Sequence, residues 1–110
     1  MNVIKRIEDL GDVICVTYVN GKYTVPYKDA LEVISERISF NGARLTPGEV
    51  YSQKFLLPTA ISKIDAARNT ERHRMPYGTE DTARVDAFLF IVEHKVKGYD
   101  NLTSLADAYL

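Results

Sequence analysis

The sequence concentrates arginines in one short segment, RNTERHRMPYG, at residues 68 to 78. Arg68, Arg72 and Arg74 stand there beside a single acid, Glu71. Guanidinium groups bind phosphate bidentately and stack on base rings, so this cluster suits a nucleotide better than a bare metal ion or a carboxylate. The competing interpretation is a solvated segment at a helix end, where basic side chains are stabilised by the terminal carbonyls. Three neighbours add hydrogen-bonding or aromatic groups to the candidate ligand-binding residues: Asn69, His73 and Tyr77.

An aromatic side chain on the next predicted helix belongs with this cluster. The main apolar stripe of that helix follows helical spacing through Val85, Leu89, Val92 and Val96. Phe90, His94 and Lys97 lie off the stripe and form a second face. Phe90 therefore contributes to a subunit interface or a widened core, or it provides a platform on which a base stacks. A dimer that brings this face to the arginine segment could build a pocket that one small chain cannot enclose.

Catalytic and metal-binding patterns are missing from the sequence. His73 and His94 occur without an HxxxH, HExxH or CxxC arrangement, so we expect no metal site and no cofactor. The acidic pair Glu80 and Asp81 is explained by a helix start, and neither a nucleophile elbow nor a glycine-rich phosphate loop occurs. We therefore expect a binding protein and not an enzyme.

Composition predicts one soluble domain spanning residues 1–110. The chain has 14 basic and 15 acidic side chains and a formal net charge of −1, which leaves no general attraction to nucleic acid or acidic membranes. The single cysteine, Cys15, lies in an apolar run and is expected to be buried. The N-terminus has no apolar signal region and no run approaches a membrane span, so we expect a cytoplasmic protein.

The first third of the chain predicts a small antiparallel sheet followed by a helix. Residues 3 to 27 are β-rich, and Asn20-Gly21 between two such runs indicates a hairpin with a type I′ turn. Pro26 places the second hairpin strand at an edge or ends it. From Asp29 the apolar spacing becomes helical for about three turns, until Asn41-Gly42 supplies a left-handed stop.

The rest of the chain predicts further helices. Thr46-Pro47-Gly48-Glu49 is a capping sequence that predicts the start of a helix. The apolar stripe of this helix continues past Pro58, so the segment is either one kinked helix or two successive helices. This helix is expected to end at 68–70 and to be followed by a loop to Gly78, where the next helix starts. The fold class is therefore α+β, with the N-terminal sheet followed by three to four helices.

The last segment, KGYDNLTSLADAYL, predicts a short closing helix capped by Asp100 or Asn101. Its apolar side chains lie on one side and suit docking against the core or a neighbour: Leu102, Leu105 and Tyr109. The segment also resembles the first helix of a helix-turn-helix, but no recognition helix follows it, so we do not expect binding to double-stranded DNA.

The order of these elements, from the hairpin VNGKYTVPY through the arginine segment to the helix FLFIVEHKVKGY, resembles the anti-Thoeris signal-sequestering proteins of phages. The resemblance covers most of the chain at the level of architecture and size. It implies a dimer or higher homo-oligomer that binds cyclic ADP-ribose isomers without turnover, in the host cytoplasm if the chain is phage-encoded. It also implies that Arg68, Arg72 and Arg74 bind phosphate, that Phe90 stacks on the base and that Asn101 contacts the base edge.

Two other functions stay open at this point. A small protein–protein inhibitor or adaptor could cap a host enzyme through a surface patch, or pair its hairpin edge with a partner strand. A small enzyme acting on nucleotides is the weaker alternative, and the signal bound by a sequestering protein could equally be a cyclic oligonucleotide.

Overall fold

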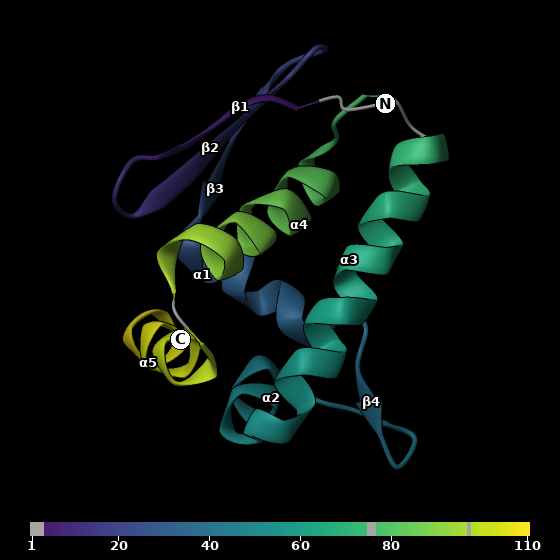
Figure 1. Cartoon of the computed structure of the whole chain (residues 1–110), viewed down its shortest axis with the longest axis vertical. Helices are drawn as coiled ribbons and strands as arrows, with labels where there is room; N and C mark the ends of the chain where they lie inside the picture. The colour runs from purple at the N-terminus through teal and green to yellow at the C-terminus, as the bar shows by residue number, and fades with distance from the viewer. Residues whose placement is uncertain (1–3, 75–76, 97) are drawn as a thin grey trace.

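The computed structural model describes residues 4–74, 77–96 and 98–110, and at Phe40 and His73 it describes the backbone alone. It confirms the α+β class, with an N-terminal three-stranded antiparallel sheet followed by several helices. Figure 1 shows the sheet at one end of the molecule, α4 passing through the middle and α3 standing beside α4, with α2 and α5 at the end away from the sheet.

The sheet consists of β1 (Ile4–Asp9), β2 (Val13–Tyr18) and β3 (Lys22–Pro26) in the order β1-β2-β3. The central strand is the most buried because side chains on both of its faces are covered. The β1–β2 connection turns at Gly11, whose φ of +104° favours glycine. The predicted edge position of Pro26 is confirmed, since β3 is an outer strand and ends at this residue.

Of the two Asn-Gly pairs, the first has the expected role in a hairpin and the second does not have the expected role at a helix end. The β2–β3 hairpin at Asn20-Gly21 is confirmed, but the type I′ turn is wrong because neither residue has a positive φ. Positive φ values of 53° and 78° occur instead at Asn41 and Gly42, which join the short hairpin β4 (Ser39–Phe40) and β5 (Ala43–Arg44). Asn41-Gly42 is therefore a hairpin turn and not the stop of a helix.

The first helix is shorter than predicted. It comprises α1 (Tyr27–Glu32) and the 3₁₀ turn η1 (Val33–Ser35), after which the chain extends toward β4. The predicted apolar stripe is nevertheless buried: Ala30, Leu31, Val33, Ile34 and Ile38 all belong to the core. The spacing thus identified the buried face but not the end of the helix.

The capping sequence at Thr46 is confirmed. The Glu49 N–H donates to the Thr46 hydroxyl at 3.3 Å, and the Thr46 N–H donates to the Glu49 carboxylate at 3.0 Å. The helix that follows, α2 (Pro47–Ser52), ends before a 3₁₀ turn, η2 (Lys54–Leu56), and α3 (Leu57–Arg74) begins immediately afterwards. The segment around Pro58 is therefore two helices and not one kinked helix, and the proline lies in the first turn of the second helix.

The predicted loop at residues 68 to 78 is wrong for its first part. Helix α3 continues to Arg74, so Arg68, Arg72 and Arg74 are helical and not loop residues. Arginine is a good helix former, and two of these side chains find acidic partners on the helix itself and on α4. The helix persists without an apolar stripe because those ion pairs replace apolar contacts at its end.

The central helix α4 (Glu80–Phe90) continues through a π-helical turn, η3 (Ile91–Lys95). Its start is confirmed by a Thr79–Thr82 capping box. The predicted stripe is not its most buried side, because the helix is covered by the sheet, α1 and α3. Its buried side chains are Ala83, Asp86, Ala87, Phe88, Leu89 and Ile91, whereas the predicted Val85, Val92 and Val96 are half-buried.

The closing helix α5 (Tyr99–Tyr109) docks its apolar side on α1 and α2 through Leu102 and Ala106. The predicted cap is wrong. Gly98, with φ +91°, is the N-cap, and Asp100 and Asn101 lie within the first turn. Among the residues described here, no helix is long and apolar enough to cross a membrane.

Candidate functional site

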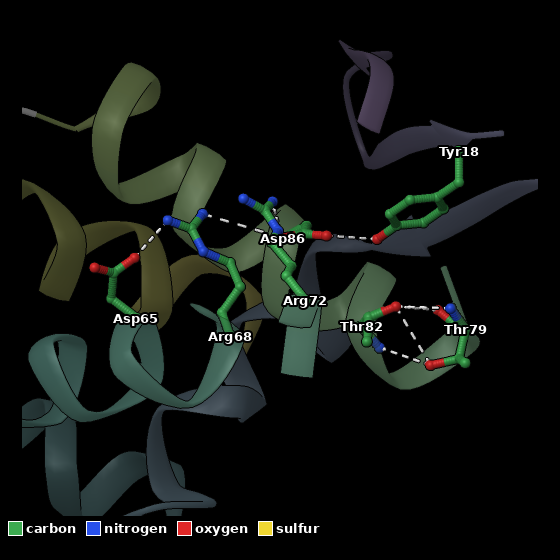
Figure 2. Close-up of polar contacts among 7 residues, drawn as sticks. All are labelled: Tyr18, Asp65, Arg68, Arg72, Thr79, Thr82 and Asp86. Carbon is green, nitrogen blue, oxygen red and sulfur yellow. Dashed lines mark hydrogen bonds and ion pairs between the residues drawn. The ribbon is translucent and has the colours of Figure 1, made fainter. Parts of the chain in front are cut away.

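A buried carboxylate, Asp86 on α4, joins the sheet to α3 (Figure 2). Only 3% of Asp86 is exposed. The Tyr18 hydroxyl donates to Asp86 Oδ2 at 2.6 Å, and Arg72 Nη2 donates to Asp86 Oδ1 at 2.9 Å. Burial, followed by the hydrogen bond to Asp86, raises the pKa of Tyr18 above its ordinary value, so the phenol stays protonated as a donor. Both carboxylate oxygens of Asp86 are thus engaged by protein groups.

The second arginine of α3 lies one turn before Arg72 and shares the same carboxylate. Arg68 Nη1 is 4.0 Å from Asp86 Oδ1, and its Nη2 pairs with Asp65 on α3. The side chains of Arg68 and Arg72 are 20% and 24% exposed, so each presents part of its guanidinium to the surface. The Nε atoms of both are buried and have no hydrogen-bond partner. Two partly exposed guanidinium groups therefore stand side by side with donors to spare.

A small hollow lies on one side of this arginine pair. It is lined by Tyr18, Tyr77 and Gly78 together with residues of α3 and α4, and its volume is about 10 Å³. A space of that size holds about one water molecule. This hollow is too small to be a ligand site.

A larger groove opens on the other side of the arginine pair. We call it the Arg68–Phe90 groove; its volume is about 270 Å³. It runs between β1, α3 and the end of α4, and its lining residues are Ile4, Ile7, Arg68, Arg72, Asp86, Phe90, Glu93 and His94. It combines an apolar wall from β1, two cations from α3 and two rings from α4 and η3.

The π-helical turn η3 shapes the α4 side of the groove. It begins immediately after Phe90 and contains Glu93 and His94. The rings of Phe90 and His94 lie with centroids 4.7 Å apart at an interplanar angle of 41°. Such π turns inside helices occur frequently at functional sites, where they redirect side chains. Here the turn begins where the helix reaches the groove.

The groove can accommodate a planar ring and an anionic group at once. The Phe90–His94 ring pair offers an aromatic surface for stacking, and Arg68 and Arg72 offer guanidinium donors that match phosphate oxygens. Asp86 holds part of each guanidinium and so limits the positive charge that the groove presents. The arrangement suits a ligand that combines a base with phosphate and not a bare anion.

The structure brings three of the predicted site residues together: Arg68, Arg72 and Phe90 all line the groove. Phe90 is half-buried and packs against the core, which agrees with the widened core that its position off the stripe left open. Tyr77 lines the small hollow on the other side of the arginines.

Two further predicted residues on α3 do not line the groove. Asn69 and Arg74 are exposed on α3, and neither lines it. The side chain of His73 lies outside the described part of the structure. Asn101 is on α5, which docks on α1 and α2, and it does not line the groove, so its base-edge contact stays a prediction.

Sequence reasoning missed the acids of the site. Asp86 stands at the middle of a helix, and nothing in its immediate neighbours indicates that it is buried between Tyr18 and Arg72. Glu93 lies three residues after Phe90, a spacing that places both on one side of a helix and could have identified it.

A second large groove lies among α1, α2 and α5. Its volume is about 510 Å³, and its lining includes Lys28, Glu32, Tyr51 and Asp107. The hydroxyl of Tyr51 donates to the Leu31 carbonyl, and Lys28 and Glu32 form a long ion pair of 4.0 Å. Lys28 is the one cation among its described lining residues and lies with two carboxylates, Glu32 and Asp107, so the groove does not combine several cations with rings as the Arg68–Phe90 groove does. Within the described residues, no three His, Cys, Asp or Glu side chains are arranged to hold a metal ion.

Comparison of the chain with protein-family models, with curated proteins and with solved structures finds no match.

Proposed function

We propose that the protein binds a cyclic nucleotide signal without turnover and thereby sequesters it, as a phage counter-defence protein would in the host cytoplasm. The ligand is a cyclic ADP-ribose isomer or a cyclic oligonucleotide. The observation that carries this proposal is the Arg68–Phe90 groove, which is lined by two guanidinium groups and by the tilted ring pair of Phe90 and His94. Phosphate and base are the two chemical groups that such an arrangement recognises.

The buried carboxylate of the groove has a structural role. Asp86 accepts hydrogen bonds from Tyr18 and Arg72 and so holds these side chains in place. The groove provides positioning groups, and the proposal assigns them to ligand affinity.

The size of the groove supports a homo-oligomer. At about 270 Å³ it is smaller than the pockets that enclose drug-sized ligands, which span roughly 300–1,000 Å³, and it is open on one side. A second copy of the chain closing over the open side would enclose a cyclic dinucleotide or cyclic ADP-ribose isomer. A sequestering protein needs such enclosure because its Kd must lie below the concentration that activates the effector.

The test is isothermal titration calorimetry of the purified protein with cyclic ADP-ribose isomers, cyclic di-GMP and cyclic di-AMP. We expect at least one of them to bind and to be recovered intact after heat release. Phe90→Leu keeps an apolar side chain against the core but removes the ring, and should weaken binding by at least about 5-fold, since stacking on one base contributes roughly 1–3 kcal/mol.

Phe55→Leu is the matched control, because Phe55 lies on η2 outside the groove and is 68% exposed. This variant should bind as the unaltered protein does. Absence of binding by every nucleotide in the panel, or equal binding by Phe90→Leu and Phe55→Leu, contradicts the proposal.

A second candidate function is a protein–protein inhibitor or adaptor. The observation in its favour is a pair of exposed aromatic side chains, Phe55 on η2 and Tyr99 at the start of α5, connected through the Lys54–Asp100 ion pair of the same two elements. Exposed aromatic residues that form a patch are common where partners dock. An apolar hollow of about 240 Å³, which Tyr99 helps to line, adjoins this surface.

The two functions separate experimentally. If the protein is an adaptor, a host protein co-purifies with it, Phe55→Ala abolishes that association, and no nucleotide binds in the calorimeter. If the protein sequesters a nucleotide, Phe55→Ala leaves ligand affinity unchanged.

A further inference from the structure

We infer that the Arg68–Phe90 groove selects guanine over adenine, and that Glu93 is the residue that reads the base. This inference rests on the proposed nucleotide-binding function and names the class of nucleotide. It follows from the position of one carboxylate beside the ring pair and from the hydrogen-bonding edges of the two purines.

Glu93 lies on the same side of the helix as the rings. Phe90, Glu93 and His94 follow one another at i, i+3 and i+4, and all three line the groove. Glu93 Oε2 is 3.9 Å from His94 Nε2, which is too long for a hydrogen bond, and the Glu93 side chain is 56% exposed. The carboxylate therefore stands at the edge of the ring surface with acceptor capacity to spare.

The other carboxylate of the groove cannot take this role. Asp86 is buried, and its two oxygens already accept hydrogen bonds from Tyr18 and Arg72. A base stacked on Phe90 and His94 would thus meet one accessible carboxylate, that of Glu93.

A carboxylate favours guanine because it only accepts hydrogen bonds. The Watson–Crick edge of guanine presents two adjacent donors, N1–H and the N2 amino group, which match the two oxygens of Glu93. Adenine presents the N1 acceptor beside its N6 amino group, so one carboxylate oxygen would face a lone pair. Arg68 and Arg72 line the same groove and are assigned to the phosphate, so the base edge is left to Glu93.

The experiment compares cyclic di-GMP with cyclic di-AMP by calorimetry on the unaltered protein and on Glu93→Gln. We expect the unaltered protein to bind cyclic di-GMP about 10-fold more tightly or better, the size of discrimination that a bidentate base contact gives. The amide of Glu93→Gln presents one donor and one acceptor. The variant should therefore bind cyclic di-GMP more weakly and lose the preference for guanine, while its affinity for cyclic di-AMP stays the same or improves. Glu80→Gln, at the exposed first turn of α4 and outside the groove, is the matched control and should retain the preference.

Each outcome decides between the inference and the function on which it rests. Equal affinity for the two dinucleotides, or a preference that survives Glu93→Gln, overturns the role of Glu93 and leaves the proposed function standing. Binding of a cyclic ADP-ribose isomer without binding of cyclic di-GMP does the same. Absence of binding by all three ligands overturns the proposed function together with the inference.

Discussion

The ring of Tyr18 occupies the space that a side chain at position 78 would need. A Cβ atom on Gly78 would lie 2.1 Å from Cδ2 and 2.2 Å from Cγ of Tyr18. Tyr18 cannot move aside cheaply, because it is fully buried and its hydroxyl is held by Asp86. The close approach of this glycine to the sheet fixes where α4 begins, and α4 carries one wall of the groove.

We predict that Gly78→Ala destabilises the protein by about 2 kcal/mol or more, since overpacking a tight contact typically costs 1–3 kcal/mol. The free energy of unfolding from urea denaturation measures this. Gly48→Ala on α2 is the matched control, because a Cβ there meets nothing within 4 Å and the residue lies in a helix. Gly48→Ala should leave stability unchanged or raise it by up to about 1 kcal/mol. Equal stability of the two variants would contradict the assigned contact.

The buried carboxylate of Asp86 leads to a second prediction. Asp86→Ala leaves the Tyr18 hydroxyl and the Arg72 guanidinium without their acceptor. Breaking a buried charge pair costs about 3–5 kcal/mol, and because Arg72 is partly exposed we expect the lower end, about 3 kcal/mol. Urea denaturation again provides the measurement.

Tyr18→Phe is a milder variant with which the stability of Asp86→Ala can be compared. It removes one hydrogen bond but leaves the ion pair with Arg72, so the loss should be about 1–1.5 kcal/mol. If Asp86→Ala costs no more than Tyr18→Phe, the ion pair with Arg72 contributes nothing to stability, which contradicts the prediction.

Much of the fold could be predicted from local patterns. The β-branched runs before Pro26, the capping sequence at Thr46 and the helix start at Thr79 depend on residues close together in the chain, and all three are confirmed. The end of α3 could not be predicted in this way. Its last turns are held by contacts of Arg72 with Asp86 on another helix, and no local pattern reports such a contact.

In the candidate site, too, the residues that a local pattern identifies differ from those that tertiary packing brings in. Arg68 and Arg72 were identifiable because they are clustered in the sequence. The apolar wall from Ile4 and Ile7 was not, because it arrives from a strand more than fifty residues away and depends on how the sheet packs on α4. Asn101 does not line the groove, because its helix docks on α1 and α2.

The two Asn-Gly pairs lead to a third prediction. At the first pair the Asn20 side chain forms two hydrogen bonds with the Gly78 backbone, each of 3.0 Å, whereas Asn41 has the positive φ that glycine also tolerates. Asn20→Gly should therefore cost about 1–3 kcal/mol through the two lost bonds, and Asn41→Gly should cost no more than a few tenths.

Thermal denaturation of the two variants in the same buffer measures this difference in stability. The substitutions are chemically identical, so they control for each other. A larger loss at Asn41 than at Asn20 would mean that the side chain of Asn20 does not fasten the β2–β3 hairpin to the start of α4.

The fourth prediction concerns alkaline pH. Burial raises the pKa of Tyr18, Tyr27 and Tyr51 above the ordinary value, and carboxylate partners raise it further at Tyr18 and Tyr27. The unfolded chain releases these phenolic protons near pH 10, while the folded protein retains them. The stabilisation is thus complete below pH 10 and is lost as the pH rises above it, by up to about 1.4 kcal/mol per pH unit for each of the three.

Urea denaturation at a series of pH values above neutrality, with tyrosinate absorbance followed in parallel, tests this dependence. The absorbance of three of the seven tyrosines should appear together with unfolding and not before it. Tyr51→Phe removes one ionising group whose hydroxyl only donates to the Leu31 carbonyl, so its stability should fall less steeply with pH. Ionisation of all seven tyrosines while the helical circular dichroism persists would show that these phenols are reached by solvent in the folded state, and would contradict the packing that places Tyr18 against Asp86.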